Sequence, residues 1–156
     1  MAANQAAELS DKNIVVVSTK TIPQGITAMT LFNEDSAPED NLKTMEDGIA
    51  IVKTGQVTYA VRDTEIDGKK IKEGNILGLV SKSIVVVGED KYQVCEKVLE
   101  NMVDDDSELI TVFYGEDTDE DKTDKLKKDM ENKYKDIDVH FYKGNQPLYY
   151  FIISVE

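Results

Sequence analysis

The chain has 156 residues, of which 40% are hydrophobic, so it is long enough to bury a core of its own. Asp and Glu number 31 against 18 Lys and Arg, which gives a net charge of −13. This balance argues against sequence-independent nucleic-acid binding and against docking on anionic lipid surfaces, because both depend on basic residues.

The first residues predict the end of a helix. Ala2 to Glu8 are strong helix formers that follow no N-cap, so we expect residues 1–12 to be the tail of an upstream helix or a linker, and the chain to be a C-terminal piece of a longer protein. Residues 13–156 are then expected to form a single domain. The only cysteine, Cys95, excludes an intrachain disulfide, and no apolar run reaches the length of a membrane span. We therefore expect a cytoplasmic protein.

The apolar run Ile14–Val17 predicts a buried strand over about residues 13–17. The polar loop 18–25 follows it and is expected to open a short helix near 25–32. In open α/β sheets, ligands and partners bind at the carboxyl ends of strands. The loop contains hydroxyls and Lys20 but no residue suited to proton transfer, so it favours holding a ligand or partner over catalysis.

A second helix is predicted after a turn at residues 33–36. Ser36 is the expected N-cap, Pro38 lies in the first turn, and Glu39 is the capping-box partner of Ser36. Gly48 within this helix costs about 1 kcal/mol relative to Ala unless close packing requires it. The predicted apolar stripe consists of Leu42, Met45, Ile49 and Val52.

The middle of the chain predicts short strands. Alternating side chains indicate a strand over residues 57–61, and Asp67-Gly68 predicts a tight turn. Two further strands, 76–80 and 84–87, form a predicted antiparallel hairpin. Residues 88–90 close that hairpin and begin a helix.

The last third predicts a strand at 109–114, a helix at about 119–135, and strands at 137–142 and 149–155. The order of elements indicates an α/β fold with a mainly parallel sheet flanked by helices and an antiparallel hairpin.

No catalytic or metal-binding constellation stands out. The acidic stretch 116–121 resembles the start of a calcium loop, but Lys122 and Lys128 occupy positions that need Gly and Glu, so a helix N-terminus is favoured. The helical pattern predicts that Cys95 is a buried, inert thiol. His140 is predicted on the outer face of its strand, and no Cys/His spacing supports zinc.

Two strand ends are candidates for recognition. Arg62 follows a predicted strand, where a charged side chain reaches into a cleft or forms a strand-end salt bridge. Residues 144–148 form a polar turn before Tyr149 and Tyr150, which serve either as interface anchors or as core packing.

Three segments together resemble one family: residues 13–25, residues 55–64, and residues 144–147 with the terminal 152–156. They are similar to the C-terminal domain of bacterial fatty acid kinase catalytic subunits, which are dihydroxyacetone-kinase-like proteins. The likeness spans nearly the whole chain, and the TKTIPQG and VTYAVRDT segments are its most specific parts.

This resemblance implies a DegV-like α/β domain that lacks the lipid-binding helical domain. It also implies a non-catalytic role in lipid metabolism and phospholipid synthesis, in which the domain docks a separate DegV-like fatty acid-binding protein for phosphorylation by its own kinase chain. ATP and magnesium are expected in the N-terminal domain, and no cofactor is expected in this chain. The segment Asn145-Gln146 departs from the His-Gly-Pro pattern with which DegV-like binders hold the acyl carboxylate. The implied partner contacts are Lys20, Thr21, Gln24, Arg62 and Gln146.

Two other functions stay open. The loop over residues 19–24 could hold an anion in a small-ligand or acyl-sensing domain, although the net charge of −13 opposes this. An independent enzyme such as a hydrolase is disfavoured, because no nucleophile and base are suitably spaced.

Overall fold

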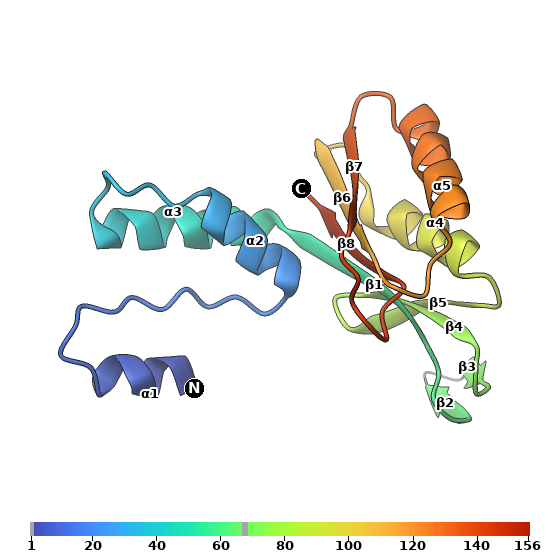
Figure 1. The fold of residues 1–156 in the computed structure, drawn as a ribbon, viewed down its shortest axis with the longest axis horizontal. Coiled ribbons are helices and arrows are strands. Elements are labelled where there is room, and N and C mark those ends of the chain that lie inside the picture. Colours follow the sequence, from blue (N-terminus) through green and yellow to red (C-terminus); the bar gives the residue numbers. More distant parts are fainter. Residues whose placement is uncertain (1, 67–68) are drawn as a thin grey trace. The chain divides into compact units, whose positions relative to one another are not determined.

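The computed structural model describes residues 2–66 and 69–156, which fall into two compact units, Met1–Val52 and Lys53–Glu156 (Figure 1). The predicted turn at Asp67-Gly68 lies outside the described residues. One DegV-like domain over residues 13–156 stays a prediction. Within the described ranges, no helix is both long enough and apolar enough to cross a bilayer.

The first unit contains three helices, α1 (Ala2–Glu8), α2 (Ile22–Thr30) and α3 (Pro38–Ile51). The Thr21 hydroxyl caps α2 by accepting the Gln24 N–H at 3.3 Å, and a proline stands in the first turn. A Cβ on Gly48 would overlap Leu31 Cδ1, so the approach of the Leu31 side chain to α3 requires this glycine. This close packing explains a glycine inside a helix.

The predicted strand at residues 13–17 is wrong, because this segment joins neither of the sheets that the described residues form. Ile14 and Val15 are 45% and 39% exposed. Apolar residues give a segment the tendency to be a strand, but a strand also needs a neighbour to pair its N–H and C=O groups. No strand of the first unit supplies one in the described residues.

The predicted capping box at Ser36 and Glu39 is also wrong, since the N-cap of α3 is Ala37. The buried Asn41 stabilises the preceding turn instead. Its Oδ1 accepts the Asn33 N–H at 2.8 Å, and its Nδ2 donates to the carbonyls of Asn33 and Ser36 at 2.7 and 3.2 Å. These bonds place Ser36 inside the turn, one residue before the cap.

The second unit is an α/β structure with a six-stranded sheet in the order β5-β4-β1-β8-β6-β7 and a separate two-stranded sheet, β2-β3. Its elements are β1 (Lys53–Tyr59), β2 (Thr64–Ile66), β3 (Lys69–Ile71), β4 (Ile76–Val80), β5 (Ser83–Gly88), α4 (Lys91–Met102), β6 (Leu109–Tyr114), α5 (Glu120–Lys133), β7 (Asp138–Lys143) and β8 (Phe151–Val155).

The expected mainly parallel sheet is wrong, because only β6 and β7 pair in parallel among the six strands and their other neighbours are antiparallel. A parallel pair needs a long crossover, and α5 supplies one between β6 and β7. The β4–β5 connection is a tight turn in which Ser81 and Lys82 have φ of +49° and +74°, as a type I′ hairpin requires.

The core lies between one face of the large sheet and helices α4 and α5, which Figure 1 shows on the same side. Gly55 and Gly78 let α4 approach the sheet closely, since a Cβ on Gly55 would lie 2.5 Å from Met102 Sδ. Cys95 is completely buried, as predicted, and burial raises the pKa of its thiol above the ordinary range.

Strand direction determines where the candidate residues lie. The pairings make β1, β5, β6 and β7 run the same way, so their carboxyl ends share one edge of the sheet. The segment after β1 contains Arg62, and the β7–β8 connection contains Gln146. These two predicted contacts therefore lie at the same edge.

Candidate docking surface

In the first unit, hydrogen bonds join the three predicted contacts of the loop before α2. The Lys20 N–H donates to Gln24 Oε1 at 2.9 Å, and the Gln24 N–H donates to the Thr21 hydroxyl. Gln24 Nε2 donates to the Ile49 carbonyl at 3.3 Å, which ties α2 to the end of α3. Thr21 and Gln24 therefore shape the loop, while Lys20 is exposed.

In the second unit, Arg62 is exposed just beyond β1. It takes part in none of the ion pairs among the described residues, so no strand-end salt bridge holds it. Its neighbour Asp63 accepts the Glu73 N–H at 2.7 Å, which ties down the backbone beside it. Arg62 is thus a cation available to a partner.

Gln146 lies in the connection from β7 to β8 and points inward. Its Nε2 donates to the Phe113 carbonyl at 2.9 Å, and its own carbonyl accepts the Glu116 N–H at 3.3 Å. A Cβ on Gly115 would lie 2.6 Å from the Gln146 carbonyl oxygen, so this glycine lets the connection pack against the end of β6. Gln146 shapes a candidate surface more than it forms one.

An aromatic and cationic cluster occupies the same edge. The rings of Tyr59 and Tyr150 lie 6.0 Å apart, and Lys91 Nζ lies 4.4 Å from the Tyr150 ring centroid. Lys91 also donates to the Asp117 carbonyl. Burial raises the pKa of Tyr150, and Asp117 and Tyr59 raise it further. Sequence reasoning missed Lys91, because its role depends on α4 beginning at this edge.

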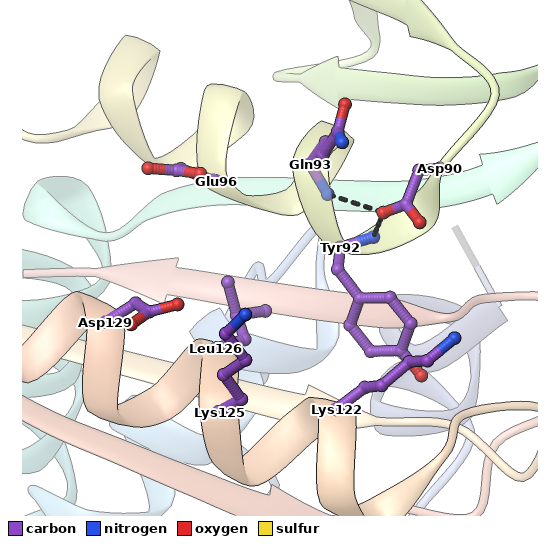
Figure 2. Close-up of a pocket in the computed structure, with 8 residues that line it drawn as sticks. All are labelled: Asp90, Tyr92, Gln93, Glu96, Lys122, Lys125, Leu126 and Asp129. Carbon is purple, nitrogen blue, oxygen red and sulfur yellow. Dashed lines mark hydrogen bonds between the residues drawn. The ribbon is translucent and has the colours of Figure 1, made fainter.

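A groove of about 280 Å³ runs between α4 and α5 (Figure 2). Asp90 Oδ1 accepts the N–H groups of Tyr92 and Gln93, both at 2.9 Å, and so caps α4. The Tyr92 hydroxyl accepts the Asp119 N–H at 2.7 Å. The groove is lined by Asp90, Tyr92, Gln93, Glu96, Lys122, Lys125, Leu126 and Asp129. This mixture of charges, with its aspartate occupied in capping, offers no pairing of nucleophile and base.

The first unit contains an apolar hollow of about 390 Å³. It is lined by Asn13, Val15, Val17, Phe32, Glu34, Ser36, Pro38, Asn41, Leu42 and Met45. Its size and composition are those of small-ligand sites.

The residues considered for chemistry are not arranged for it. His140 lies exposed on the outer face of β7, as predicted, while Cys95 is buried in the core. Asp119 caps α5 by accepting the Lys122 N–H at 2.9 Å, which confirms the acidic stretch as a helix start. Within residues 2–66 and 69–156, no three His, Cys, Asp or Glu side chains are placed to hold a metal ion.

Comparison with known proteins identifies the chain. The FakA-like family, which is the C-terminal part of a fatty acid kinase subunit, matches residues 1–156. Protein YloV of Bacillus subtilis is 41% identical over all 156 residues, and uncharacterized proteins of Staphylococcus haemolyticus and Staphylococcus aureus are 40% and 41% identical over the same length. The chain spans 28% of the length of each of these relatives.

Proposed function

The chain belongs to the FakA-like family of fatty acid kinase C-terminal domains, and we propose that it docks a separate, acyl-loaded binding protein onto the kinase. The observation that carries this proposal is the family match over the whole chain, residues 1–156. The inert placement of Cys95 and His140 supports a non-catalytic role.

The proposed partners are a DegV-like fatty acid-binding protein and the remainder of the kinase chain. We assign ATP and magnesium to the N-terminal kinase domain, outside this chain. The described residues offer no three-ligand metal cluster, so no step of phosphoryl transfer is routed through them. What this chain contributes is recognition of the partner.

Docking would assist phosphorylation by positioning. The acyl carboxylate of the partner's bound fatty acid has to be held close to the γ-phosphate of ATP for transfer to occur. A specific but reversible interface that holds it there buries about 1,200–2,000 Å² in total. Such positioning contributes several kcal/mol to the rate without a catalytic side chain.

The five proposed contacts divide into two kinds. Lys20 and Arg62 are exposed cations that can meet a partner directly. Thr21, Gln24 and Gln146 hold the loops around them through hydrogen bonds to the backbone. We propose that the first kind supplies direct contacts and the second kind sets loop shape.

Calorimetric titration of the chain with a fatty acid-loaded DegV-like binding protein tests the proposal, with saturable 1:1 binding as the expected result. Arg62→Glu should weaken binding about tenfold while the melting temperature stays nearly unchanged. The matched control is Lys97→Glu on the exposed side of α4, which should bind like the wild type. Absence of wild-type binding contradicts the proposal, and a large loss of stability in Arg62→Glu would make Arg62 structural.

The apolar hollow of the first unit favours acyl sensing as a second candidate function. A ligand that binds only the folded state raises the melting temperature with the logarithm of its concentration above its Kd. A concentration-dependent shift with free fatty acid that disappears in Met45→Asp would support acyl sensing. A constant melting temperature with fatty acid and with acyl phosphate would remove it.

A further inference from the structure

The connection from β7 to β8 holds Leu148 in a conformation that leucine rarely adopts. Its φ is +69°, and the Tyr149 N–H donates to the Pro147 carbonyl at 2.8 Å, so residues 147–149 form a γ-turn of the positive-φ kind. This form is rare and strained, and a bulky side chain makes the strain larger. Asn145, with φ of +51°, is a residue type that tolerates such a backbone.

Hydrogen bonds on both sides of the turn keep Leu148 in this conformation. The Thr58 hydroxyl of β1 donates to the Leu148 carbonyl at 2.8 Å, and the Tyr150 N–H donates to the Val57 carbonyl at 2.8 Å. From β6, the Gly115 N–H donates to the Tyr150 carbonyl at 2.9 Å. Two strands therefore fix the backbone around the strained residue, which is the condition under which such strain persists.

Packing does not compensate for the strain. The Leu148 side chain is 58% exposed and that of Tyr149 is 36% exposed, whereas Phe151, two residues further, is completely buried. A leucine in the core would justify an awkward backbone by the apolar area it buries. Here the clamped turn presents the leucine to solvent, and strain of this kind is concentrated at functional positions.

Carboxylates surround this turn on the same edge of the sheet. They follow the ends of β1, β5 and β6 and are exposed: Asp63, Glu89, Asp90, Glu116 and Asp117. Lys91, at this edge, is engaged with the Tyr150 ring and the Asp117 carbonyl. An exposed apolar anchor inside an acidic rim is complementary to an apolar pocket with a basic rim.

We propose that Leu148 is the apolar anchor of the docking surface and inserts into an apolar pocket with a basic rim on the acyl-loaded binding protein. This inference rests on the proposed function and names the contact through which it operates. The strained turn preorganises the anchor, so little loop entropy is lost on binding.

The decisive variant is Leu148→Asn, because asparagine tolerates positive φ and keeps the turn while the apolar side chain is removed. Leu148→Gly serves as a second variant, since glycine adopts this backbone without strain. Ile51→Asn is the matched control, because Ile51 is 64% exposed and lies in the other unit. Each is titrated with a DegV-like binding protein loaded with palmitate, and each melting temperature is measured.

The expected result is that both Leu148 variants raise the Kd at least about tenfold with an unchanged or higher melting temperature, while Ile51→Asn binds like the wild type. Wild-type binding should also weaken as NaCl rises from about 0.05 to about 0.5 M. If the wild type binds and Leu148→Asn binds equally well, this inference is overturned and the proposed function stands. If binding ignores salt, the basic rim is overturned. If the wild type does not bind, both proposals fall.

Discussion

Replacing Gly78 by alanine tests how closely α4 approaches β4. A Cβ at this position would overlap Val98 Cγ2 and would lie 3.0 Å from Val94 Cγ1 and 3.2 Å from Val86 Cβ. Val94 and Val98 belong to α4, where valine has one strongly preferred rotamer. None of these side chains can turn aside cheaply, so the helix or the strand has to move.

The expected cost follows from two opposing effects. Adding a methyl group to a close-packed core costs about 1–3 kcal/mol. Removing a glycine from the interior of a strand recovers about 0.5–1 kcal/mol. The net loss in the free energy of unfolding is therefore about 1–2 kcal/mol, which for a chain of this size lowers the melting temperature by about 2–8 °C.

Urea unfolding followed by circular dichroism measures this loss. Gly25→Ala is the matched control, because nothing lies within 4 Å of its Cβ position in α2, and it should gain about 0.5–1 kcal/mol. Combining Gly78→Ala with Val98→Ala should cost less than the sum of the two single changes, since the smaller side chain makes room for the methyl group. A Gly78→Ala variant as stable as the wild type, or strict additivity in the double variant, would refute the close approach.

Two further predictions concern α4. Asp90→Ala should lower the free energy of unfolding by about 1 kcal/mol in urea unfolding, because Asp90 caps the helix through two N–H groups, and Asp90→Asn should retain most of that stability. Burial raises the pKa of Cys95, so above about pH 8.5 the unfolded chain loses the thiol proton while the folded chain retains it. Stability should then fall between about pH 8.5 and 9.5 by up to about 1.4 kcal/mol per pH unit, and Cys95→Ala, compared by urea unfolding at each pH, should lack this part of the slope. Equal slopes in the two proteins would contradict the buried, neutral thiol.

Local chemistry was enough to predict most of the second unit. Asp90 and Asp119 each precede a helical apolar pattern, and both cap helices that begin at the next residue. The strands over 76–80 and 109–114 have the predicted bounds, because turn residues or a helix end flank each apolar run. These signals act within one element or its flanks, where sequence patterns are most informative.

Pairing could not be predicted in the same way. The run Ile14–Val17 has the apolar character of a buried strand, yet it joins neither sheet among the described residues. The direction of β8 between β1 and β6 depends on how three distant segments assemble. Each strand's own residues specify which side chains face the core, but not which neighbour it finds or in which direction that neighbour runs.

The same distinction applies to the docking surface. The letters of the segment after β7 indicate a turn, but only the assembled β6, β7 and β8 turn Gln146 inward onto Phe113 and leave Leu148 exposed with positive φ. Loss of binding in a Gln146 variant would therefore not identify a contact, because the loop that carries the anchor would change shape. Leu148→Asn removes the side chain and keeps the backbone, so a loss of binding there at unchanged stability reports the contact itself.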